Sequence, residues 1–149
     1  MDLRRDDSGT VIEPEFHDGQ LLGFVLSPSD QSLAIFCQTV DKLDYVIRVP
    51  SLVRFRGDDF REGNIIFDIS IREGRAIPPS AVRKVWSYDD AEADKFLTSR
   101  LEEIGRGKWT LLEVTSSYGG QLLAISRSST GSLTITAAKY SSTTTTPTG

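Results

Sequence analysis

Apolar and polar residues alternate with a period of two along most of this chain, which is the pattern of half-buried antiparallel strands. In the cleanest run, Ile65, Phe67, Ile69 and Ile71 fall on one side of a strand and polar residues fall between the last three. Runs of the same kind span 20–27, 33–37, 45–49, 53–56, 109–115, 121–127 and 132–138. Together these runs predict about seven mostly antiparallel strands.

One segment has the period of a helix instead. Its apolar residues recur at spacings of three and four and form one stripe. Ser87 suits the N-cap of this helix, and Gly105 follows its last apolar residue, Ile104. The pair Pro78-Pro79 is expected to stop regular structure before it. We therefore predict one amphipathic helix over 87–104 and an α+β fold, in which the sheet is curved or forms two layers.

The phrase Gly-Gln-Leu-Leu occurs twice, at 19–22 and at 120–123, and predicts a hairpin near each end of the sheet-rich region. The chain has 149 residues, which fits one domain. Residues 1–9 are charged and lack an apolar rhythm, so we expect a mobile leader there. The Ser/Thr-rich residues 141–149 predict a disordered tail, which leaves a single domain over 10–140.

Charge and cysteine content narrow the functional classes. The formal net charge of −4 argues against a general nucleic-acid binder, which needs a basic surface, but allows a basic protein partner. No window approaches the roughly 18 apolar residues of a membrane helix, and no secretory signal is recognisable at the start. Cys37 is the only cysteine and is expected to be a small buried side chain. A reducing cytoplasmic location fits these features best.

The segment Glu15-Phe16-His17-Asp18-Gly19 is the first candidate for chemistry, because His17 is the only histidine. An imidazole beside Asp18 and Glu15 has the groups of a general base or a metal ligand. The structural alternative, which we favour, is that His17 and Asp18 bind backbone groups at the entrance of a strand, where Gly19 permits a turn.

Two further groups are candidates for binding. Asp58, Asp59 and Glu62 lie in a glycine-bounded loop, and oxygen-rich loops bind hard cations. Their spacing differs from that of an EF-hand, so a solvated loop without a metal is the favoured interpretation. A second group consists of basic side chains on strands, which would dock an acidic protein partner or a phosphate. Its members are Arg48, Arg54 and Arg56. The favoured interpretation is ordinary outward-facing charge that keeps a sheet soluble and discourages edge pairing.

The run Phe16-His17-Asp18-Gly19 enters an apolar strand, and a second strand and a later Val-x-Phe/Leu segment follow it. In this order the stretch 15–70 resembles the opening of several small bacterial sheet-rich families. Some of these families are uncharacterised, and others are similar to immunity proteins that neutralise polymorphic toxins. The resemblance implies a non-catalytic binding protein in which His17 and Asp18 are structural.

Our expectation is a non-enzymatic protein-binding domain of the bacterial cytoplasm, similar to an immunity protein and without a cofactor. One alternative is a small hydrolase or metal-dependent enzyme that uses His17 with nearby carboxylates. Another is a small-ligand carrier with a pocket between sheet and helix. The phosphate-binding loop, the Gly-x-Ser-x-Gly elbow and the His-Glu-x-x-His motif are absent from the sequence.

Overall fold

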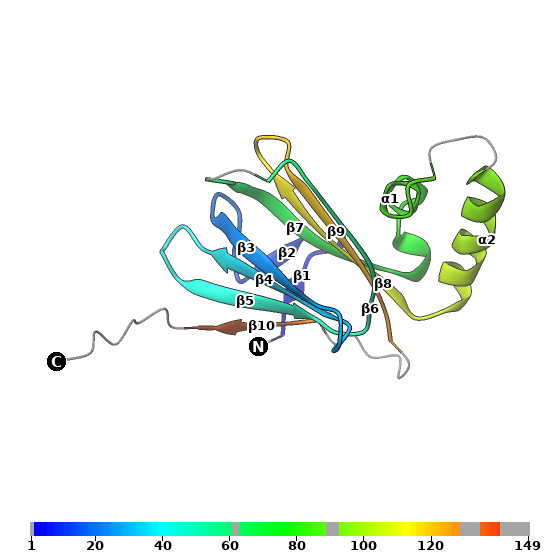
Figure 1. Cartoon of the computed structure of the whole chain (residues 1–149). Coiled ribbons are helices and arrows are strands. Elements are labelled where there is room, and N and C mark those ends of the chain that lie inside the picture. Colours follow the sequence, from blue (N-terminus) through cyan, green and yellow to red (C-terminus); the bar gives the residue numbers. More distant parts are fainter. Residues whose placement is uncertain (1, 61–62, 89–92, 129–134, 141–149) are drawn as a thin grey trace.

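The computed structural model describes residues 2–60, 63–88, 93–128 and 135–140. Within these ranges the chain has ten strands and two α-helices, which confirms the predicted α+β class (Figure 1). The strands are β1 (Arg4–Arg5), β2 (Val11–Glu13), β3 (Gln20–Ser27), β4 (Ser32–Gln38), β5 (Asp44–Val49), β6 (Leu52–Asp58), β7 (Ile66–Glu73), β8 (Trp109–Ser116), β9 (Gln121–Arg127) and β10 (Thr136–Lys139). The helices are α1 (Pro79–Val85) and α2 (Ala93–Arg106), and a 3-10 turn, Gly74–Ala76, precedes them.

Two four-stranded antiparallel sheets form the body of the fold. One has the strand order β10-β5-β4-β3, and we call it the open sheet. The other has the order β6-β9-β8-β7, and we call it the covered sheet because α1 and α2 lie on its outer face (Figure 1). The ribbon β1-β2 lies beside β7, where Thr10 forms a bridge to Ser70. The layers are therefore open sheet, covered sheet and helices.

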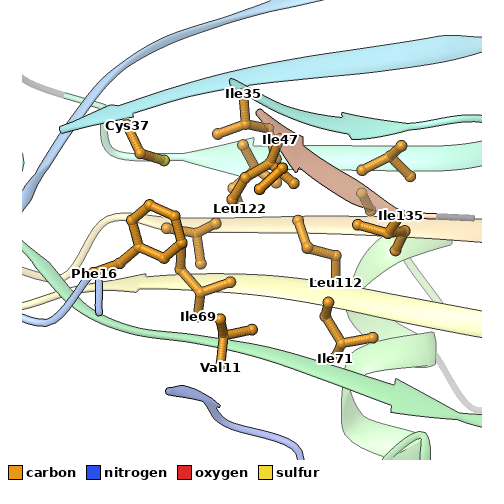
Figure 2. Close-up of a cluster of buried hydrophobic side chains, with 14 of the residues drawn as sticks. Val11, Phe16, Ile35, Cys37, Ile47, Ile69, Ile71, Leu112, Leu122 and Ile135 are labelled. Atoms are coloured by element: carbon orange, nitrogen blue, oxygen red, sulfur yellow. The ribbon is translucent and has the colours of Figure 1, made fainter. Parts of the chain in front are cut away.

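The main core lies between the two sheets, where alternate residues of each strand meet (Figure 2). Ile35 and Ile47 of the open sheet face Leu112 and Leu122 of the covered sheet, and all four are fully buried. Each such side chain contributes about 1.5–3 kcal/mol by leaving water. A second cluster joins the helices to the outer face of the covered sheet. Leu123 of the covered sheet belongs to this cluster. The central strands β8 and β9 of the covered sheet are thus buried on both faces.

Backbone hydrogen bonds join the two sheets at the entrance of β3. The N–H of Asp18 donates to the carbonyl of Ile66 (2.9 Å), and the N–H of Ile66 donates to the carbonyl of Gly19 (2.8 Å). Gly19 is required there, because a Cβ on it would lie 2.2 Å from the carbonyl oxygen of Gln38. This junction fixes the segment that carries His17 against the start of β7.

The helical region differs from the prediction of one helix over 87–104. Two helices form, and α2 begins, among the described residues, at Ala93 rather than at Ser87. Ser87 has a left-handed φ of 55° and follows the end of α1, which accounts for the break. The pair Pro78-Pro79 begins a helix instead of stopping structure, since Pro79 occupies the N1 position, where its missing N–H is not needed. Residues 89–92 lie outside the described ranges.

Two other expectations also differ from the structure. Phe67 was placed inward, but a bulge between Ile66 and Asp68 shifts the alternation, and Phe67 is 51% exposed. The expected mobile leader contains strand β1, and Arg5 donates from Nη1 to the carbonyl of Ile71 (2.9 Å).

The predicted disordered tail at 141–149 lies outside the described residues. No helix in the described ranges is long and apolar enough to cross a membrane.

Candidate functional site

His17 lies on the segment that leads from β2 into β3, at the end of the sandwich where the two sheets are joined. Its Nδ1 donates a hydrogen bond to the carbonyl oxygen of Phe67, 50 positions later in the chain. The two rings also meet edge to face, with centroids 5.6 Å apart. The Nε2 atom points toward Asp18, whose Oδ1 is 3.7 Å away. The predicted backbone-binding role of His17 is therefore seen, although its partner is distant in sequence.

The surroundings of His17 favour its protonated form. The hydrogen bond to the Phe67 carbonyl raises the pKa of the imidazole above its ordinary value of 6.5, and the Asp18 carboxylate raises it further. Weaker contributions in the same direction come from Glu15 and Asp68. The imidazole thus lies in the field of three carboxylates, two from the segment between β2 and β3 and one from β7.

Two hollows flank His17, and the imidazole forms the ridge between them. The first has a volume of about 270 Å³ and lies between the β2 segment and the start of β7. The second has a volume of about 380 Å³ and lies between residues 14–18 and the turn that joins β4 to β5. Both hollows are lined by Glu15 and His17, so they adjoin at these two residues. We call this strip of two adjoining hollows the His17 groove.

Exposed apolar side chains and carboxylates both line the His17 groove; we call the apolar side chains its floor and the carboxylates its rim. Large apolar side chains that are exposed to solvent line it, in the first hollow or in the second. They are Ile12, Phe67, Val40 and Leu43, which are 39%, 51%, 59% and 43% exposed. The carboxylates that line the same hollows are Glu15, Asp18, Asp41 and Asp68. A ligand that contacts this strip meets apolar surface and negative charge together.

Among the described residues, the printed contacts of His17 are with Phe67 and with the neighbouring Asp18. One ring nitrogen is occupied by the Phe67 carbonyl. Among the described residues, Asp18 supplies the one carboxylate within 4.0 Å of the imidazole, and it is the adjacent residue. Cys37, the one thiol, is fully buried in the core, and burial raises its pKa to about 12. A nucleophile activated by His17 is therefore not assembled within the described ranges.

Of the candidate metal ligands, the structure describes Asp58 and Asp59. Asp58 accepts a hydrogen bond from Arg56 Nε at 3.0 Å, and Asp59 follows with a left-handed φ of 58°. Glu62 lies outside the described residues. Across the ranges that the structure describes, no three His, Cys, Asp or Glu side chains are grouped so as to hold a metal ion.

The three arginines predicted to share a basic face lie on two different faces. Arg48 is exposed on the outer face of the open sheet, opposite Ala34 in the pairing of β4 with β5. Arg54 and Arg56 are opposite Ile125 and Leu123, whose side chains pack under the helices, so both project to the helix side of the covered sheet. Arg54 and Arg56 share one face of β6, as predicted. The bend between β5 and β6 at 50–51 separates Arg48 from them.

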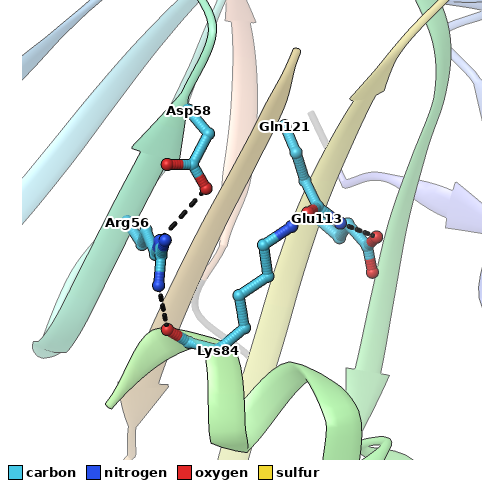
Figure 3. Close-up of polar contacts among 5 residues, drawn as sticks. All are labelled: Arg56, Asp58, Lys84, Glu113 and Gln121. Atoms are coloured by element: carbon cyan, nitrogen blue, oxygen red, sulfur yellow. Dashed lines mark hydrogen bonds and ion pairs between the residues drawn. The ribbon is translucent and has the colours of Figure 1, made fainter. Parts of the chain in front are cut away.

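Arg56 belongs to a polar network that holds α1 on the covered sheet (Figure 3). Its Nη1 donates to the carbonyl of Lys84 at 2.8 Å, near the end of α1. The Lys84 ammonium donates in turn to Gln121 Oε1, and Gln121 Nε2 donates to Glu113 Oε1 at 2.7 Å. This chain of contacts could not be predicted from the sequence, because its members come from α1, β6, β8 and β9. Its partners are internal, so we assign it a structural role.

The sequence pattern also did not predict the apolar residues of the His17 groove as part of a site. Phe67 was assigned to the core because the bulge in β7 was not visible in the pattern. Val40 and Leu43 lie in or next to the β4–β5 turn, where apolar side chains are unusual, and this is the signal that could have identified them.

Comparison with known proteins finds no matching family model, no matching curated protein and no matching solved structure. Function must therefore be inferred from the surface itself.

Proposed function

We propose that this chain is a non-enzymatic protein-binding domain, and that its His17 groove receives a partner segment that carries apolar and basic side chains. The observation behind this proposal is the combination of exposed apolar residues and carboxylates in one concave strip. Exposed apolar patches rimmed by polar groups are typical of interaction sites. Residues 15–70 resemble the opening of several small bacterial sheet-rich families, and those of them that are similar to immunity proteins would be non-catalytic binders.

The apolar floor supplies the contact area. Phe67 and Val40 lie on opposite sides of the His17 ridge, one in each hollow. Each is more than half exposed, so a partner that covered both would remove substantial apolar surface from water. Aromatic residues such as Phe67 are enriched at the centres of protein interfaces. The strip therefore has an anchor on each side of His17.

The rim determines the sign of the partner's charge. Glu15 and Asp68 border the first hollow, and Glu15, Asp18 and Asp41 border the second. Lysine or arginine side chains would be attracted to both borders and would raise the association rate. The net charge of −4 for the whole chain acts in the same direction at long range. A basic partner is therefore favoured over an acidic one.

A comparative capture experiment tests this function. The wild-type chain, tagged at its C-terminus, is used as bait in a lysate of the source organism, and bound proteins are quantified by mass spectrometry. Variants Phe67→Ser and Asp41→Lys change the floor and the rim of the groove. Their matched controls are Tyr118→Ser, an aromatic that is 66% exposed elsewhere, and Asp7→Lys on an exposed turn.

We expect a basic protein that is retained by the wild type and by both controls and is lost from both groove variants. Each variant is checked by circular dichroism and by its melting temperature, so that loss of binding is separated from loss of fold. Retention of every captured protein by Phe67→Ser and Asp41→Lys would contradict the assignment of the groove as the binding site.

A further inference from the structure

The strand β3 forms one border of the open sheet, and most of its outer side is unpaired within the described ranges (Figure 1). Its first residues have partners there, since Gln20 forms a bridge to Ile65 and the N–H of Leu21 donates to the carbonyl of Asn64 at 2.9 Å. From residue 22 to residue 27, no described strand pairs with this side of β3. A strand in this position presents main-chain N–H and C=O groups as a template for another strand.

The other three borders of the two sheets are protected. The border formed by β7 lies beside the β1-β2 ribbon, through the bridge between Thr10 and Ser70. The border formed by β10 is four residues long, and Asp2 forms a bridge to Thr136 at its start. The border formed by β6 carries the charged side chains Arg54, Arg56 and Asp58. A covering segment, a short strand and charge are the means by which proteins prevent pairing at a sheet border.

The strand β3 lacks these means of protection. It is eight residues long, the stretch 19–29 contains no charged residue, and the first proline of that stretch is Pro28. Val25 and Leu26 are 57% and 45% exposed. A bulge between Leu21 and Gly23 interrupts the pairing with β4, so the regular run covers 23–27. This run is therefore the part of the sheet borders that is most open to a further strand.

The side chains of this run are arranged symmetrically about Val25. Phe24 lies opposite Ile35, and Leu26 lies opposite Leu33. Both of these β4 residues are buried in the core, so Phe24 and Leu26 belong to the inner face of the open sheet. Val25 lies between them and belongs to the outer face. The run thus has an apolar inward residue on each side of an apolar outward one.

This arrangement is complementary to itself. A two-fold axis at Val25, perpendicular to the open sheet, places a second β3 antiparallel beside the first. Val25 then lies opposite Val25 of the partner subunit, and Phe24 lies opposite Leu26 of the partner subunit. The members of each pair lie on the same face, as cross-strand neighbours do. Two-fold interfaces have this reciprocal form, in which one patch serves both subunits.

We propose that β3 is a self-association edge and that its occupant is the β3 of a second copy of this chain, paired antiparallel about Val25. The two open sheets then form one continuous sheet. Because residues 19–29 are uncharged, no like charges meet in this pairing, and the strand does not select a partner of either charge. The residues of the run, 23–27, do not line the His17 groove, so the dimer contact is separate from the proposed binding site.

The extent of the contact indicates a reversible dimer. The regular run is about 17 Å long, and one pair of strands of this length has few cross-strand pairs. Interfaces that are smaller than about 800 Å² per partner are typical of weak or transient association. The dimer is therefore expected to assemble with concentration rather than to be permanent.

Sedimentation equilibrium of the full chain, from about 1 µM to about 1 mM, tests the proposal. The wild type is expected to shift from monomer to dimer within this range. Val25→Lys places two lysines directly opposite each other and should weaken the dimer at least about tenfold. Val53→Lys is the matched control, because Val53 is a valine on the border strand β6 that is 42% exposed, and it should leave the dimer unchanged.

Mixing two charge variants gives the sharpest result. Val25→Glu alone should be weakened in the same way as Val25→Lys, because two carboxylates then lie opposite each other. An equimolar mixture of Val25→Lys and Val25→Glu places opposite charges together and should form a heterodimer.

Hydrogen exchange of the wild type provides a measurement that does not depend on the folding of a variant. The amides of 23–27 should exchange more slowly at about 1 mM than at about 1 µM, whereas those of 53–57 on β6 should exchange at the same rate at both concentrations.

A wild type that stays monomeric at every concentration, a dimer that is unaffected by Val25→Lys, or a dimer without added protection at 23–27 would overturn the proposal. None of these results would bear on capture through Phe67 and Asp41, so failure of the dimer is distinguishable from failure of the proposed function.

Discussion

The imidazole of His17 is hydrogen bonded to the main-chain carbonyl of Phe67, so the entrance of β3 is tied to the bulge of β7. The same bulge turns the Phe67 side chain out to solvent, where its ring contacts the imidazole. The hydrogen bond thus fixes His17 between the two hollows, and the bulge exposes Phe67 in the groove. In our proposal, a histidine that binds the backbone thus lies at the centre of the binding surface.

The pH dependence of stability tests this role of His17. Its pKa is raised in the folded chain, so its stabilising contribution is fully present below its ordinary value of 6.5 and is lost as the pH rises through the raised value. His17→Gln keeps an N–H donor but does not titrate. The wild type should therefore exceed His17→Gln in melting temperature by more at about pH 5.5 than at about pH 9. An equal difference at both values would contradict the contact.

The junction between the sheets predicts a steric effect at Gly19. A Cβ there would lie 2.2 Å from the Gln38 carbonyl oxygen, which is backbone and cannot move without disturbing β4. Gly19→Ala should lower the free energy of unfolding by about 1–3 kcal/mol. Gly23→Ala is the control, because a Cβ there meets nothing within 4 Å. Urea unfolding curves measure both, and equal stability of the two variants would count against the junction.

Two neighbouring glycines near the end of α2 predict opposite outcomes. Gly105 lies within α2, and a Cβ there makes only ordinary contacts with Arg75 at 3.7 Å. Gly105→Ala should stabilise the chain by up to about 1 kcal/mol, because alanine favours the helix. At Gly107 a Cβ would lie 2.6 Å from Nε1 of the buried Trp109, so Gly107→Ala should destabilise. Thermal melts that give the same sign for both would contradict the packing of α2 on β8.

The environment of Cys37 predicts low reactivity. The thiol is fully buried and its pKa is raised to about 12, so almost no thiolate forms near neutral pH. Iodoacetamide at about pH 8 should leave the native chain unmodified and should alkylate it fully in denaturant. Mass spectrometry reads both states. Rapid alkylation of the native chain would show that Cys37 is accessible.

Much of the sheet architecture follows from the alternation of apolar residues. The predicted strand 20–27 coincides with β3 and 121–127 coincides with β9, because a turn residue bounds each run. The bulges in β3 and β7 were not predictable, since they depend on pairing with a distant strand. For the same reason the sequence placed Phe67 inside, and the groove forms only because the fold brings 10–17 beside β7 and 39–43 beside 14–18.

The candidate site, like the sheets, could be predicted from the sequence only in part. Local chemistry drew attention to His17, Asp18 and Glu15, and all three line the groove. The basic face failed, because a two-residue bend sends Arg48 and Arg54 to different sheets. Alternation along a strand is a local property, whereas the assignment of strands to sheets depends on the whole fold.

Site-specific photo-cross-linking tests the central claim most directly. A photoreactive phenylalanine analogue replaces Phe67 in one variant and Tyr118 in another, and both are expressed in cells of the source organism. Both side chains are exposed, but only Phe67 lines the His17 groove. The account predicts a cross-link to a basic protein from position 67 and none to that protein from position 118. Absence of an adduct at position 67, or the same adduct from both positions, would contradict it.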